Sequence, residues 1–172
     1  VAREASAELG PQHIESVAPL TEAAAIAGRL GMLDAANRDF SEALAALRER
    51  AHTRSWRLSE TLARYGNIML ASKQYHQAAA LLTEALDGYL DPSIKGPNHP
   101  DSLTVSRWAS QALEANGELA RAATILKQHY ELASAEAGPA SVARDIACDL
   151  AALFRRAGDQ TSAAEWARAC QP

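Results

Sequence analysis

Aromatic residues, cysteines and long apolar runs are scarce in this chain. Each scarcity argues against a kind of structure. Aromatic side chains make up 5% of its 172 residues, although hydrophobic residues make up 48%. The apolar set is therefore mostly alanine and leucine, which favour helices that pack closely. No segment shows the alternating β-branched pattern that predicts strands. We therefore expect an all-α fold.

The chain also has no segment dominated by one sign of charge and no run long enough to span a membrane. The 17 basic and 21 acidic residues are interspersed and give a net charge of −4. No basic stripe of the kind that nucleic-acid-binding proteins present is visible. No apolar run approaches the roughly 18 residues that a membrane helix needs. We expect neither nucleic acid nor a membrane as a partner.

Residues able to carry chemistry are few. Cys148 and Cys170 are too few for a disulfide framework, so the predicted compartment is the reducing cytoplasm. The 5 histidines never fall four apart on one helix, and no cysteine stands at ligand spacing from them. Phosphate-binding loops and nucleophile elbows are absent. We expect no catalytic residue, no metal and no cofactor. The alternative is an all-α enzyme whose site forms between helices without a sequence motif.

Pairs of helical stretches alternate with turn-forming clusters. Residues 96–101 read Gly-Pro-Asn-His-Pro-Asp, which no helix crosses, and His99 is expected to cap or brace the helix that follows. One helical stretch then runs to Asn116, and a second runs from there to a closing Gly138-Pro139. One linker and two antiparallel helices form a repeat unit.

Three further helix pairs fit the same unit. The first pair begins at Ser16 as N-cap and continues with a second helix over 33–50. In the second pair, Lys73 stands where the other pairs have glycine, and a left-handed turn would strain it by about 1 kcal/mol. The last pair has Ser141 as N-cap.

Residues 1–12 are expected to be the end of a preceding repeat. Residues 5–11 match residues 133–139 almost residue for residue, and the latter form a helix end and its linker. We expect this chain to be a piece of a longer one. The predicted organisation is a single helical solenoid over 1–172, with repeats at 13–53, 54–97, 98–140 and 141–172.

These pairs resemble tetratricopeptide repeats (TPRs), in which small residues recur where two helices cross. Aligning the helix-to-helix turns places repeat position 1 at Val17, Ser59, Leu103 and Arg144. Position 8 is small throughout, at Ala24, Gly66, Ser110 and Ala151. Position 20 is alanine throughout, at Ala36, Ala78, Ala122 and Ala163.

The repeat length points to a subtype. The first positions lie 42, 44 and 41 residues apart, more than the roughly 34 residues of the standard repeat. This period and the Gly-Pro-Asn-His-Pro-Asp joint resemble the kinesin-light-chain-like subtype, which occurs in motor light chains and bacterial signalling proteins. The resemblance implies a right-handed α-solenoid whose first helices line a concave groove that holds a peptide.

The resemblance also implies which side chains face that groove. The predicted peptide-binding residues are Arg64, Asn67, Arg107, Trp108 and Gln111. The polar members would hydrogen-bond a ligand backbone, with Trp108 as an apolar anchor and Asn67, Arg107 and Gln111 as the central cluster. The alternative is that these residues are ordinary solvated helix faces.

One familiar TPR ligand is disfavoured. A chaperone's terminal carboxylate needs a Lys/Asn/Arg clamp, and the equivalent positions include Trp108, Asp145 and Asp149. We therefore expect a non-catalytic scaffold for another protein or peptide partner. The alternative is a regulatory or self-assembly module of a larger protein, such as a bacterial signalling protein, that packs through exposed terminal helices.

Overall fold

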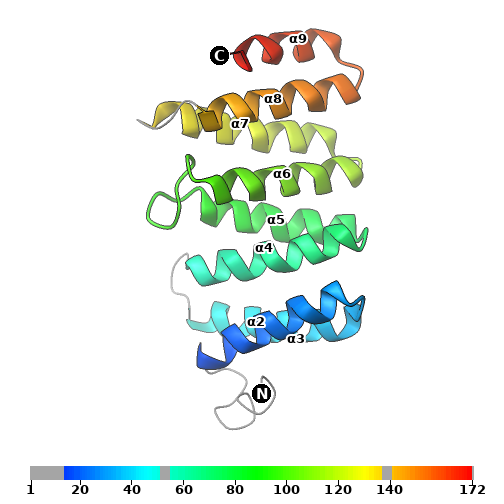
Figure 1. Ribbon diagram of the computed structural model, residues 1–172, viewed down its shortest axis with the longest axis vertical. Coiled ribbons are helices and arrows are strands. Elements are labelled where there is room, and N and C mark those ends of the chain that lie inside the picture. Colours follow the sequence, from blue (N-terminus) through cyan, green and yellow to red (C-terminus); the bar gives the residue numbers. More distant parts are fainter. Residues whose placement is uncertain (1–13, 51–54, 137–140, 172) are drawn as a thin grey trace. The chain divides into compact units, whose positions relative to one another are not determined.

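The computed structural model describes residues 14–50, 55–136 and 141–171, and all regular structure within these ranges is α-helix (Figure 1). The all-α prediction is confirmed. The helices are α2 (Ile14–Arg29), α3 (Leu33–Arg50), α4 (Trp56–Ala71), α5 (Tyr75–Tyr89), α6 (Pro100–Ala115), α7 (Leu119–Ala135), α8 (Ser141–Arg156) and α9 (Gln160–Ala169).

The chain divides into two compact units, residues 1–88 and 89–172. In the first unit, α2 packs against α3 and α4, and α3 also packs against α4. In the second unit, α7 packs between α6 and α8, α6 also contacts α8, and α9 packs against α8. Each unit is therefore built from antiparallel helix pairs in which a first helix contacts the first helix of the next pair.

Small residues lie where paired helices cross, as the repeat register predicts. The four position-20 alanines are at most 3% exposed. At position 8, a Cβ added to Gly66 would lie 2.6 Å from Cγ of Leu82. A larger side chain at these positions would separate the helices, because interiors are packed without spare volume.

Left-handed residues make the turns within the pairs. Gly31, Gly117 and Gly158 have φ of 77°, 83° and 81°, and Lys73 has φ of 61°. Lys73 therefore has the left-handed backbone on which the predicted strain depends. This conformation is cheap for glycine and costly for a side chain with a Cβ.

The helix starts only partly match the predictions. His99 caps α6, and its Nδ1 accepts a hydrogen bond from the backbone N–H of Asp101 at 3.1 Å. Two other N-caps are wrong, because α2 begins at Ile14, ahead of Ser16, and Ser141 is itself the first residue of α8. The predicted half-repeat at residues 1–12 lies outside the described residues.

Side chains of α6, of α7 and of the joint itself fix the long joint that precedes α6. Nε2 of the fully buried His129 lies 2.7 Å from the carbonyl oxygen of Pro97. Ser102 Oγ donates to the carbonyl of Gly96 at 2.7 Å, and Asn98 Nδ2 donates to the carbonyl of Ala133 at 3.2 Å. The joint therefore belongs to the packed part of the second unit.

Candidate functional site

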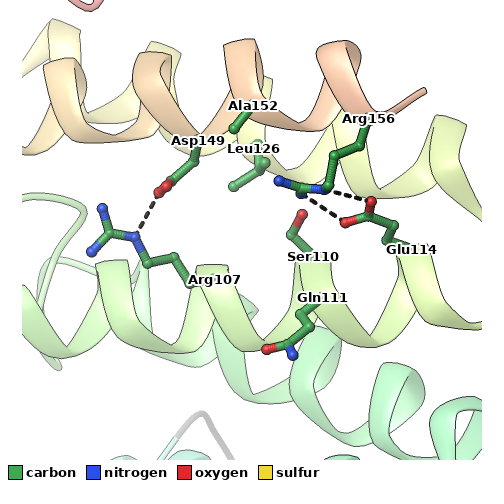
Figure 2. Close-up of a pocket in the computed structure, with 8 residues that line it drawn as sticks. All are labelled: Arg107, Ser110, Gln111, Glu114, Leu126, Asp149, Ala152 and Arg156. Atoms are coloured by element: carbon green, nitrogen blue, oxygen red, sulfur yellow. Dashed lines mark hydrogen bonds and ion pairs between the residues drawn. The ribbon is translucent and has the colours of Figure 1, made fainter. Parts of the chain in front are cut away.

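The first helices of the second unit enclose a hollow of about 390 Å³. Figure 2 shows α6 and α8 running side by side, with their side chains meeting across the space between them. Leu126 of α7 closes the back of the hollow and is 1% exposed. The residues that line this α6–α8 hollow are Arg107, Ser110, Gln111, Glu114, Leu126, Asp149, Ala152 and Arg156.

Two ion pairs span the α6–α8 hollow, one on each side. Arg107 Nε donates to Asp149 Oδ2 at 2.6 Å. Arg156 holds Glu114 with two hydrogen bonds of 2.8 Å each, from Nε and Nη2 to the two carboxylate oxygens. The pairs run in opposite directions, since α6 supplies the arginine of the first and the carboxylate of the second.

The charges of the α6–α8 hollow balance one another. The hydrogen bonds that Arg156 donates to Glu114 raise the pKa of Arg156 above its ordinary value, despite partial burial, and the charges of Glu114 and Asp149 add to the effect. Two cations then face two carboxylates. Exposed ion pairs of this kind contribute only about 0–1 kcal/mol each, so a ligand can displace either pair at little cost.

Two side chains of α6 that line the hollow carry polar groups without a partner among the described residues, and Figure 2 shows the Gln111 amide pointing away from α8. Gln111 is exposed, and its amide makes no hydrogen bond to any described residue. Arg107 uses Nε for Asp149, and neither of its Nη groups is bonded within the described part of the chain. The α6–α8 hollow thus combines free hydrogen-bonding groups with an apolar back wall.

The first unit has a smaller counterpart between α2 and α4, of about 160 Å³. Arg64 donates from Nη1 to Glu22 and from Nη2 to Glu60, the latter at 3.0 Å. Partial burial lowers the pKa of Arg64, but the hydrogen bond to Glu22 and the charges of both carboxylates outweigh it and raise the pKa. Trp56, 53% exposed, lies at the edge of this hollow with the Arg57 guanidinium over its ring.

The predicted site residues are distributed between these two places. Arg107 and Gln111 both line the α6–α8 hollow, and Arg64 lines the α2–α4 hollow. Trp108 is half-buried on α6 and does not line the α6–α8 hollow. Asn67 belongs to the first unit, so the predicted cluster with Arg107 and Gln111 spans two units and stays a prediction.

Sequence reasoning missed that carboxylates of neighbouring first helices pair with the arginines. The pairs Glu22–Arg64, Arg107–Asp149 and Glu114–Arg156 are each 42 residues apart. A search for opposite charges separated by about one repeat would have found all three. The arginines are therefore partly engaged by the protein itself.

Sequence reasoning also missed the pairing of the two cysteines. Cys148 of α8 and Cys170 at the end of α9 form a disulfide, with Cα atoms 4.8 Å apart. Their number had argued for a reducing compartment, and the pairing removes that argument because disulfides persist mainly in oxidising surroundings. Within the described residues, no cluster of three or more His, Cys, Asp or Glu could hold a metal ion.

The helix pairs and the hollows between first helices define a helix-pair repeat protein. No family model matches the sequence, and no curated protein matches it either. Solved structures do match: the TPR-like repeats of a Podosopora anserina protein described as a kinesin light chain align with a TM-score of 0.80 at 16% identity, covering 98% of this chain and 80% of that one. A point-substituted form of those repeats gives a TM-score of 0.79 at 17% identity, covering 97% of this chain and 78% of that one.

A third solved structure, BtubC (BKLC) from P. vanneervenii, aligns with a TM-score of 0.67 at 16% identity, covering 91% of this chain and 63% of that one. At such identities the likeness concerns the fold. The chain has the α-solenoid fold of TPR-like repeats, and these structural neighbours are kinesin-light-chain-like. None of the described helices is at once long enough and apolar enough to cross a membrane.

Proposed function

We propose that the chain is a non-catalytic scaffold that binds a protein or peptide partner, and that the α6–α8 hollow receives an extended segment of that partner. The observation that carries this proposal is the arrangement of the hollow. Within the described residues, Gln111 and the Nη groups of Arg107 have no hydrogen-bond partner, and Leu126 closes the back of the hollow that they line. A peptide backbone offers matching donors and acceptors at every residue.

The dimensions of the α6–α8 hollow suit a short extended segment. Arg107 and Glu114 are two turns apart on α6, so the two ion pairs are separated by about 10.5 Å along the helix axis. Three extended residues span about 10 Å. One side chain of such a segment could face Leu126 and Ala152, while its backbone meets Gln111.

We infer that neither nucleic acid nor a membrane is the partner, because the charges of the hollow cancel and the chain carries no basic stripe. Catalysis is not proposed, since the α6–α8 hollow pairs its carboxylates with arginines.

A peptide selection tests the proposal. A random linear-peptide display library is selected on the immobilised chain, and the binding of selected peptides is measured by calorimetry. Gln111→Ala should weaken binding about three- to tenfold through lost hydrogen bonds. Gln128→Ala, the same change at an exposed position of α7 outside the hollow, should bind as the wild type does. Equal binding by all three proteins would show that the peptides bind elsewhere.

A second candidate function, as a self-assembly or regulatory module, is favoured by an uncovered face of α2. Ile26 is 48% exposed, whereas the equivalent residues of α4 and α8, Ile68 and Leu153, are 9% and 0% exposed. Leu30 and Met32 beside it are 71% and 56% exposed. Apolar surface of this kind marks interaction sites.

Sedimentation velocity over a range of concentrations tests this second candidate. Self-association should appear as a rising sedimentation coefficient that Ile26→Lys abolishes. Ala45→Lys, at an exposed position of α3, is the control. A single unchanging monomer at high concentration would leave no support for assembly through α2.

A further inference from the structure

The disulfide occupies a specific place in the repeat. Cys148 and Cys170 lie 22 residues apart and join α8 to the C-cap of α9. Ala63 of α4 and Ala85 of α5 have the same separation and the same repeat positions, and they are 3% and 0% exposed. The disulfide therefore stands at the repeat positions where the second helix pair has two buried alanines.

Helix α9 buries few side chains against the described residues. Of its residues, all of which are described, Ala163 alone is buried, whereas α8 buries seven side chains. Trp166 is half-buried and meets the ring of Tyr130 edge-on, with centroids 5.1 Å apart. Elements with few buried apolar contacts open at low free energy. The disulfide fixes the end of α9 that is farther from the α8–α9 turn.

We propose that Cys148 and Cys170 form a redox-sensitive latch: in the disulfide state α9 is held on α8, and in the dithiol state α9 opens while the rest of the second unit stays folded. Both cysteines are half-buried, so neither residue is fully enclosed by the described part of the chain. Exchange of this kind depends on access to the sulfur. The latch does not rest on the proposed peptide binding.

The redox step is a thiol–disulfide exchange with a dithiol as reductant. One thiolate of the dithiol attacks a cysteine sulfur, breaks the Cys148–Cys170 bond and forms a mixed disulfide with that cysteine. The second thiol of the dithiol then attacks the mixed disulfide. It releases the cysteine and forms a disulfide within the oxidised dithiol. Two electrons pass to the protein, and two protons complete the Cys148 and Cys170 thiols.

The effect expected on α9 is large and local. If α9 opens while the disulfide is intact, Cys148 and Cys170 stay joined across their separation of 22 residues. The chain between them is then a closed loop with fewer accessible conformations. Reduction removes that restriction and should raise the equilibrium constant for the opening of α9 by about two orders of magnitude, from the chain entropy of such a loop. Helices α6 and α7 lie outside the loop and should keep their protection.

Hydrogen exchange with peptide-level mass spectrometry tests the latch on the whole chain. Amides of residues 160–169 should exchange about a hundredfold faster in dithiothreitol than in the oxidised protein, while those of α6 stay unchanged. The double variant Cys148→Ala/Cys170→Ala reproduces the Ala63–Ala85 pair and should exchange fast at α9 under both conditions. Thiol titration of the denatured oxidised protein should find no free thiol.

Three outcomes would overturn the latch. Free thiols in the oxidised protein would show that the disulfide does not form. Equal protection of α9 in both redox states would show that packing alone holds it. Loss of protection throughout the second unit on reduction would show a disulfide that supports the whole unit rather than α9.

Discussion

Arg107 of α6 and Asp149 of α8 are joined by a hydrogen-bonded ion pair of 2.6 Å, and they lie 42 residues apart in the chain. The same separation joins Glu22 to Arg64 in the first unit. These pairs connect successive first helices. The repeat period is therefore visible in the ion pairs as well as in the positions of small residues. A side chain that looks available to a ligand in the sequence is thus engaged by the next repeat.

The Arg107–Asp149 pair should contribute modestly to stability. In a double-mutant cycle with Arg107→Ala and Asp149→Ala, urea denaturation should give a coupling free energy of about 0.2–1 kcal/mol, because both side chains are partly exposed. The coupling should shrink at about 1 M salt, where charges are screened. The cycle of Arg107→Ala with Asp145→Ala, one turn earlier on α8, should show no coupling. Coupling of equal size in both cycles would contradict the pairing.

Ala122→Leu should destabilise the fold by about 1–3 kcal/mol through overpacking. Ala122 is 0% exposed and lies where α6 and α7 cross, whereas Ala120 of the same helix is exposed. Ala120→Leu is therefore the matched control and should be nearly neutral. Chemical denaturation measures both variants. A neutral Ala122→Leu would mean that the repeat register is misplaced.

Lys73 and Gly117 make equivalent turns and should respond in opposite ways. Both are left-handed, with φ of 61° and 83°. Lys73→Gly should stabilise by up to about 1 kcal/mol by removing strain at Cβ, and Gly117→Lys should destabilise by about the same amount. Thermal and urea unfolding of the two variants provide the measurement. A loss of stability in Lys73→Gly would show that the unfolded-state entropy of glycine outweighs the strain.

His129 should make stability depend on pH on the acidic side. Burial lowers the pKa of its imidazole below the ordinary value of 6.5, against the opposing effect of the hydrogen bond to the Pro97 carbonyl. Its folded form is therefore neutral at a pH where the unfolded form already binds a proton. The contribution of neutral His129 to the free energy of unfolding is fully present above pH 6.5. It declines as the pH falls from 6.5 toward the pKa of the folded state.

The measurement for His129 compares wild type with His129→Ala. The free energy of unfolding is determined by urea at several pH values between about 5 and 8. The variant loses the bond to Pro97 and is less stable overall, but its stability should fall less than that of the wild type as the pH drops from about 6.5 to about 5. Parallel curves for the two proteins would assign the acid sensitivity to other groups.

Local chemistry determines much of this protein. Alanine and leucine content predicts helices, and the glycines at 31, 117 and 158 predict the turns, since only a residue without Cβ adopts positive φ cheaply. The second helix of the first pair was predicted over 33–50 and α3 has those bounds. Helix starts were less predictable, because capping depends on the last residues of a linker as well as on the cap itself.

Tertiary structure alone decides which side chains remain free. Arg107 and Gln111 share one exposed helix face, yet Arg107 is bound to Asp149 from a helix 42 residues away, and Gln111 is not bound to any residue that the structure describes. Cys148 and Cys170 are two isolated cysteines in the sequence, and the crossing of α8 and α9 brings their Cα atoms within 4.8 Å. The repeating pattern determines the helices, but the packing of one helix pair on the next determines the contacts, because those depend on residues a full repeat apart.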